Sequence, residues 1–233
     1  MEFLREDDES LTEDSSEPSS SGRGWWLTLA AAAIIGFVIL WFFAPTDPGR
    51  RFDRALAATP VRPVEGRLSG VAYAKYRVKM GPADRRVPAQ LESLARGLLS
   101  HSPEDAREWH RHGMASLLAG DSLAAISAFE RAARLDARNA LYRSDLAAAR
   151  LARGVKVDDP KMLAAATGDA QRALDLVPGL PEAHFNLALA FERRHLFKDA
   201  YVTYRRYQMF DRSSPWADEA RARSERLRAL TGS

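Results

Sequence analysis

The chain has 233 residues, of which 46% are apolar, 34 are lysine or arginine, 31 are aspartate or glutamate and none is cysteine. This length suffices for one small domain with additional segments and is too short for two large domains. A sequence without cysteine excludes disulfides, thiolate metal sites, Fe–S clusters and cysteine nucleophiles. Residues 1–24 hold eight acids and two arginines, which leaves 32 basic and 23 acidic residues in the remainder.

Residues 1–24 predict a disordered acidic tail, because they are charged and serine-rich and carry too few bulky apolar groups to offset the entropy of ordering. Such a tail either solvates the chain or binds a partner, and its sequence does not decide between the two. The basic excess elsewhere is mostly arginine and accompanies an excess of alanine, as a compositional bias would produce. We therefore expect no specific nucleic-acid partner.

Residues 25–44, WWLTLAAAAIIGFVILWFFA, contain no charge. As a helix they span about 30 Å, the thickness of a hydrocarbon core, with tryptophans at both ends. The stretch has no polar face, unlike a core helix, and its acidic start is atypical of a signal peptide. It predicts a transmembrane helix in a single-pass membrane protein. Four arginines follow it within about twenty residues and two precede it, which favours a cytoplasmic location for the larger part.

Residues 45–86 are predicted to form a linker. Within it, residues 66–80, GRLSGVAYAKYRVKM, are rich in β-branched and aromatic residues and predict a short extended segment or hairpin.

Three stretches of the remaining sequence resemble one another. Their first predicted helices carry small residues at Gly113, Ala147 and Ala188, which are 34 and 41 residues apart. The additional seven residues of the second spacing fall between the two helices of the middle repeat. Glycine and proline within residues 154–160 predict that this insertion forms a loop.

The second predicted helices share a further pattern of small and aromatic residues. Its members are Ala125, Phe129 and Ala132; Ala166, Ala170 and Ala173; and Ala200, Tyr204 and Tyr207. Small residues permit paired helices to approach closely, and the aromatic residue fills the space between repeats. Helix start signals occur as a capping box at Ser102–Asp105 and as Asp159-Pro160 and Ser214-Pro215.

These features predict a repeat domain over residues 87–233. The repeats lie at about 106–139, 140–180 and 181–214, with a cap helix at 87–99 and a closing helix at 215–230. The predicted fold class is therefore all-α: a single transmembrane helix followed by a short α-solenoid of about three helix-turn-helix repeats with flanking cap helices.

The repeats resemble the tetratricopeptide-repeat (TPR) family, whose period is 34 residues. The first repeat has the family's W, G, A, F and A at Trp109, Gly113, Ala125, Phe129 and Ala132, and departs from it at His112 and Ala137. The second keeps Leu146, Ala166, Ala173 and Pro178 but has Ala170 in place of the aromatic residue. The third keeps Leu187, Phe191, Ala200 and Tyr204, with Tyr207 where alanine is usual.

Residues 61–230 also resemble the region that precedes the protease domain in bacterial membrane-anchored CHAT-domain proteins, through RPVEGRLSGVAYAKYR and the repeats after it. The sequence contains no cysteine, so no such peptidase is present. The resemblance implies a protein of the bacterial inner membrane with its repeats outside the cytoplasm, opposite to the arginine count. The side of the membrane stays open.

No motif for nucleotide binding, zinc hydrolysis, serine hydrolysis or calcium binding occurs in the sequence. His110 and His112 are two residues apart, so on one helix they point in nearly opposite directions and cannot share a metal ion. We therefore predict a protein that is not an enzyme and needs no cofactor, metal ion or small-molecule substrate. The enzymatic alternative is a hydrolase that uses serine together with His110 or His184.

The family resemblance implies a concave face lined by the first helices of the repeats, suited to a peptide or an amphipathic helix. Its usual inward positions are Arg107, His110, Met114 and Leu117; Leu141, Ser144, Ala148 and Leu151; and Glu182, Phe185, Leu189 and Glu192. None of these positions offers the lysine and asparagine of a chaperone carboxylate clamp. The predicted function is a membrane-anchored scaffold or adaptor that binds another protein or peptide in this groove; the alternative is a non-catalytic partner or remnant of a CHAT protease system.

Overall fold

The computed structural model describes residues 30, 47–77 and 87–232. The chain divides into two units, Met1–Thr46 and Asp47–Ser233, and the following paragraphs concern the second. The predicted acidic tail lies outside the described residues, as does the predicted transmembrane stretch 25–44 apart from Ala30.

The membrane prediction requires a correction. Within residues 30, 47–77 and 87–232, no helix has both the length and the apolar character needed to cross a membrane. The helices described between residues 47 and 232 all carry charged side chains, so none of them is apolar around its whole circumference. The predicted fold class with a transmembrane helix and the predicted inner-membrane localisation are therefore wrong on this finding, and the fold is an all-α solenoid.

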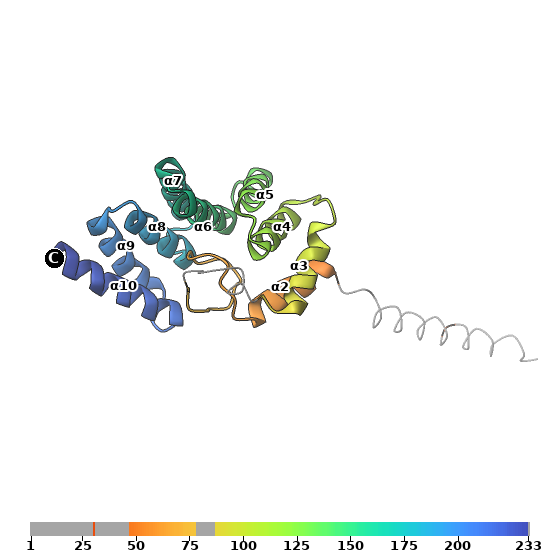
Figure 1. Ribbon diagram of the computed structural model, residues 1–233, viewed down its shortest axis with the longest axis horizontal. Coiled ribbons are helices and arrows are strands. Elements are labelled where there is room, and N and C mark those ends of the chain that lie inside the picture. The colour runs from red at the N-terminus through yellow and green to blue at the C-terminus, as the bar shows by residue number, and fades with distance from the viewer. Residues whose placement is uncertain (1–29, 31–46, 78–86, 233) are drawn as a thin grey trace, which may run out of the picture. The chain divides into compact units, whose positions relative to one another are not determined.

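Helical hairpins build the second unit (Figure 1). Its helices are α2 (Pro48–Ala58), α3 (Ala89–Leu99), α4 (Ala106–Ala119), α5 (Ser122–Leu135), α6 (Ala140–Val157), α7 (Pro160–Leu176), α8 (Pro181–Arg193), α9 (Phe197–Phe210) and α10 (Pro215–Thr231). Helices α4 and α5, α6 and α7, and α8 and α9 pair as hairpins, α3 packs on α4, and α10 packs on α9. Helix α2 is an addition to the prediction, because it lies within the expected linker.

Local capping chemistry explains where several helices begin. The Asp159 side chain accepts hydrogen bonds from two backbone N–H groups at the start of α7, and Ser214 accepts one at the start of α10, as the sequence predicts. At α4 the predicted cap is displaced by three residues. Asp105 accepts the N–H of Glu108 at 2.8 Å, and the Glu108 carboxylate accepts the N–H of Glu104 at 2.8 Å.

The seven-residue insertion lengthens two helices and does not form the predicted loop. Helix α6 has 18 residues and α7 has 17, against 14 each in α4 and α5. The turn between them is confined to Asp158, in a left-handed conformation, and Asp159. Gly154 serves close packing here, since a Cβ atom on it would lie 2.8 Å from Cδ2 of Leu163 on α7.

The small residues of the first helices lie at buried helix crossings, as the sequence predicts. Ala147 and Ala188 are at most 1% exposed, and Gly113 is also buried. A Cβ atom on Gly113 would lie 2.6 Å from the ring of Phe129, so glycine there lets the phenylalanine of α5 pack directly against α4.

Residues 61–77, which we call the strap, pass along the inner side of the helices without regular secondary structure (Figure 1). The predicted extended segment or hairpin therefore forms no strand within residues 66–77, and residues 78–80 lie outside the described residues. The apolar side chains Val61, Val64 and Leu68 of the strap are buried in one core cluster with residues of α2, α3, α4 and α6. The strap is thus part of the folded core.

Candidate functional site: the groove and the strap within it

We call the surface that contacts the strap the groove. It is formed by α6, α8, α9 and α10 and by the residues that directly follow α9. Its members are Asp145, Ala148, Glu182, Asn186, Arg193, Tyr207, Asp211, Trp216, Glu219 and Arg223. Helix α4 adds His110, which bonds Asp145.

Two buried polar residues hold the backbone of the strap. The Asn186 side chain accepts the N–H of Arg67 at 2.7 Å and donates to the carbonyl oxygen of Arg67 at 2.9 Å. Asp145 accepts the N–H of Ser69 at 2.9 Å and also accepts the hydroxyl hydrogen of Ser69. Asn186 and Asp145 are 1% and 0% exposed, so these bonds form away from water.

Gly66 brings the strap into direct contact with the helices. A Cβ atom at this position would lie 2.8 Å from Cβ of Ala148 and 2.8 Å from Oδ1 of Asn186. Side chains cannot be accommodated at that separation, because Ala148 has no rotamer to change. Glycine therefore allows the strap backbone to lie within hydrogen-bonding reach of Asn186.

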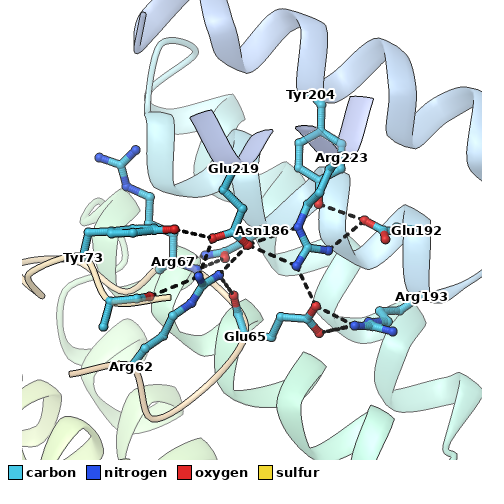
Figure 2. A network of polar contacts seen from close by, with 11 residues as sticks. Arg62, Glu65, Arg67, Tyr73, Asn186, Glu192, Arg193, Tyr204, Glu219 and Arg223 are labelled. Atoms are coloured by element: carbon cyan, nitrogen blue, oxygen red, sulfur yellow. Dashed lines mark hydrogen bonds and ion pairs between the residues drawn. The ribbon is translucent and has the colours of Figure 1, made fainter. Parts of the chain in front are cut away.

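Arg62 is the most enclosed charge of the strap (Figure 2), with a side chain only 3% exposed. Its guanidinium pairs with both carboxylate oxygens of Glu219 at 2.5 and 3.1 Å. The guanidinium carbon lies 4.3 Å from the ring centroid of Trp216 and 5.9 Å from those of Phe185 and Tyr73. Aromatic faces and a bidentate carboxylate are the surroundings that suit a planar guanidinium.

Glu65 carries the opposite charge and lies among groove arginines (Figure 2). Its carboxylate accepts hydrogen bonds from Arg223 at 2.8 Å and from Nε of Arg193 at 3.0 Å. Arg223 also bonds Glu192 at 3.0 Å and Glu219 at 3.1 Å. Burial alone would lower the pKa of Arg223, but Tyr204, Glu192 and Glu65 around it raise that pKa above the ordinary arginine value.

Arg67 occupies a third charged position. Its guanidinium donates to Asp211 at 2.8 Å and to the hydroxyl of Tyr207, and it pairs with Glu182 at 3.3 Å. Burial raises the pKa of Asp211, but hydrogen bonds from Ser214, Tyr207 and Arg67 outweigh it and lower that pKa to about 2. Asp211 is therefore a fixed anion in the groove.

The predicted groove residues fall into three groups. Met114, Leu117, Ala148, Leu151, Phe185 and Leu189 are at most 3% exposed and belong to the core. His110, Ser144, Glu182 and Glu192 make polar contacts, respectively with Asp145, Asn186, Arg67 and Arg223. Arg107 and Leu141 are exposed. The structure thus brings Ala148, Glu182 and the ring of Phe185 into contact with the strap and buries most of the apolar positions beneath it.

Three buried polar residues that hold the segment before the solenoid were not predicted to lie at the site, although the sequence contains a pattern that marks their positions. Arg111, Asp145 and Asn186 each precede the small residue of their repeat by two positions. All three are buried, and each binds the segment that comes before the solenoid: Arg111 pairs with Asp53 of α2 at 2.7 Å, as Asp145 and Asn186 bind the strap. The same buried repeat position therefore contacts residues 47–77 in all three repeats.

The strap leaves a cavity of about 360 Å³ beside it, toward α4 and α6. Pro63, Glu65 and Tyr76 line it from the strap, and Leu117 and Leu151 line it from the helices. Among residues 30, 47–77 and 87–232, no group of three or more histidine, aspartate or glutamate side chains is placed to hold a metal ion.

Comparisons with known proteins identify the fold. No protein-family model and no curated protein matches the chain. Among solved structures, MamA superposes with a TM-score of 0.50 at 18% identity, covering 66% of this chain and 87% of MamA. The first TPR of Spaghetti (RPAP3), bound to an HSP90 peptide, gives 0.48 at 18% identity, covering 55% of this chain and 97% of its own. The TPR domain of Arabidopsis OM64 gives 0.46 at 19%, covering 53% and 94%. The chain has the tetratricopeptide-repeat fold.

Proposed function

We propose that this chain is a non-catalytic protein-interaction scaffold whose groove binds an extended peptide segment. The observation that supports this most directly is the pair of hydrogen bonds between Asn186 and the backbone of Arg67. A backbone N–H and carbonyl are offered by every extended peptide, so a buried amide aimed at both recognises a polypeptide in that conformation. Asp145 likewise accepts a backbone N–H of the strap, that of Ser69, two residues further along.

The groove is filled in this structure by the chain's own strap, so an outside peptide must replace it. Phe185 and Leu189 are 0% exposed, and they support the groove from beneath. The polar residues that face the strap, chiefly Asn186 and Glu219, are the ones that would contact an incoming peptide.

The chemistry around Ser69 supports a role without catalysis. The order of contacts is serine, aspartate, histidine: Asp145 bonds both the Ser69 hydroxyl and Nε2 of His110, the latter at 2.7 Å. A hydrolase of this type places histidine between serine and aspartate, so that the imidazole takes the proton of the serine. Here the serine donates its hydrogen to a carboxylate that stays buried under it.

A test of this function uses a full-length chain whose strap is released from within. The triple variant Arg62→Ala, Gly66→Ala and Arg67→Ala changes only the strap and leaves every groove residue in place. A fluorescent peptide of residues 60–77 is titrated against it by anisotropy, with hydrogen exchange to confirm that strap amides are exposed while α4–α10 stay protected. The wild-type chain and Gly97→Ala, which lies in open space on α3, are the controls.

The proposal predicts saturable binding to the released chain and much weaker binding to both controls, in which the strap competes at high effective concentration. If hydrogen exchange shows that the strap amides are exposed and the peptide still does not bind, the groove is not a peptide site.

A further inference from the structure

The strap side chains that the groove binds indicate which side chains it selects in a peptide. Its three enclosed charges, Arg62, Glu65 and Arg67, alternate in sign, and each lies against groove residues of the opposite sign. The spacing is arginine, two residues, glutamate, one residue, arginine. This inference rests on the proposed function, because it concerns the specificity of the same groove.

The groove side of the contacts is held in place by bonds that do not involve the strap. Glu219 keeps Arg223 as a partner, and Glu192 bonds both Arg223 and the hydroxyl of Tyr204. Asp211 accepts hydrogen bonds from Tyr207 at 2.6 Å and Ser214 at 2.5 Å. These residues stay positioned when the strap leaves, so they form a preorganised surface for the next ligand.

The sites for the two arginines differ from a general negative patch. Trp216 lies within 6 Å of both guanidinium carbons, at 4.3 Å from that of Arg62 and 5.5 Å from that of Arg67. Glu219 is bound by Arg62 in a bidentate manner. A lysine ammonium has no planar fork to match the carboxylate and no flat face to lie on the indole, so the site distinguishes arginine from lysine.

An empty groove carries an electrostatic cost, because three of its acids lose the arginines of the strap while they keep their other partners. Burial raises the pKa of Glu219, but the hydrogen bond and the charge of Arg62, together with Arg223, lower it overall, so Glu219 is ionised while Arg62 is present. Without the strap, Glu182 and Asp211 lose the guanidinium of Arg67 and Glu219 loses that of Arg62. A ligand that restores both guanidinium groups removes this cost.

We propose that the groove selects extended peptides that carry arginine at one position, glutamate three residues later and arginine five residues later, and that such a peptide from another protein displaces the strap. The strap is then an internal competitor of that partner. Its Gly66 adds a requirement, because the residue between the glutamate and the second arginine must be glycine to clear Ala148.

The deciding experiment compares labelled 60–77 peptides on the strap-released full chain. The variants are Arg62→Ala, Arg62→Lys, Arg67→Ala and Gly66→Ala. The matched control is Arg77→Ala, which removes an equal charge from an exposed strap position. We expect each test change to weaken binding by about tenfold or more and Arg77→Ala to change it by less than about twofold.

Equal affinities of the Arg62→Ala, Arg62→Lys and Arg77→Ala peptides would overturn the arginine specificity while leaving peptide binding intact. Absence of binding by every peptide would instead overturn the proposed function itself.

A measurement within the otherwise unaltered chain covers the case in which the released chain does not fold. Single variants Arg62→Lys and Arg77→Ala are compared by hydrogen exchange at the strap amides. We expect Arg62→Lys to raise strap exchange at least several-fold and Arg77→Ala to leave it unchanged. Equal exchange in both variants would contradict the proposal.

Discussion

Replacement of Gly66 by alanine tests the docking of the strap with the smallest perturbation available. The added Cβ atom would lie 2.8 Å from Cβ of Ala148, 2.8 Å from Oδ1 of Asn186 and 3.2 Å from Cα of Ala148. Carbon atoms prefer a separation of about 3.5–4.0 Å, so the strap must retreat by about 1 Å. The contacts with Ala148 cannot be relieved by a rotamer change, and Ala148 is 0% exposed within α6.

The expected cost follows from the bonds that this retreat stretches. The backbone nitrogen of Arg67 now lies 2.7 Å from Oδ1 of Asn186, and a shift of that size moves it out of hydrogen-bonding range. Overpacking costs about 1–3 kcal/mol, and the lower entropy of unfolded alanine returns about 0.4–1 kcal/mol. We expect a net loss of about 1–2 kcal/mol for Gly66→Ala.

Gly97→Ala is a control with the same substitution, and we expect it to change the free energy of unfolding in the opposite direction. Gly97 lies inside α3, where an added Cβ atom would have no neighbour within 4 Å, and alanine there favours the helix by about 0.5–1 kcal/mol. Urea denaturation of both variants measures the free energy of unfolding, and hydrogen exchange locates the change. A Gly66→Ala chain as stable as Gly97→Ala, with strap amides still protected, would refute the close contact between strap and α6.

Three further outcomes follow from the structure. Burial lowers the pKa of His184 and of His112, so the unfolded chain binds more protons and stability should fall as pH decreases below about 6.5; His184→Gln should flatten this slope in denaturation curves measured from pH 8 to 5. Gly113→Leu should lower the melting temperature by several degrees, because its side chain meets the ring of Phe129, and an unchanged melting curve would contradict the helix crossing. The lowered pKa of Asp211, about 2, contributes roughly 2 kcal/mol above pH 4 that is lost between pH 4 and 2; Asp211→Asn should remove this part of the acid transition, and an identical acid transition would count against the contact with Arg67.

Periodicity predicted the helical part of the fold because the packing partners within each repeat are close in sequence. Gly113, Ala147 and Ala188 mark helix crossings whose partners lie within the same hairpin, so their spacing alone reveals them. The lengthened α6 and α7 escaped prediction, since Gly154 and Pro160 are typical of loops, while in the structure one permits close helix packing and the other starts a helix.

The sequence places the groove on the first helices of the repeats, but it does not show that the strap fills this groove, because the strap lies in a distant part of the sequence. Nothing local in Arg62 or Gly66 indicates contact with Glu219 or Ala148, and the segment has no periodicity to place it. Positions expected to line an open groove, such as Phe185, are instead covered. The sequence signal for the site lies in Asp145 and Asn186, two polar residues that precede the small residue of their repeat by two positions, and the structure shows that both are buried.

The pairing of Arg62 with Glu219 joins residues 157 positions apart. During synthesis from the N-terminus, the strap therefore leaves the ribosome roughly 8 to 30 s before the last helix that receives it, at 5–20 residues per second. For that interval the strap has only the earlier helices to pack on: Val61, Val64 and Leu68 have partners on α2, α3, α4 and α6, whereas Arg62 still lacks Trp216 and Glu219. The pairing of Arg62 with α10 is consequently the last contact of the strap to form, and a nascent chain arrested before α10 would present Arg62 without its carboxylate and indole partners.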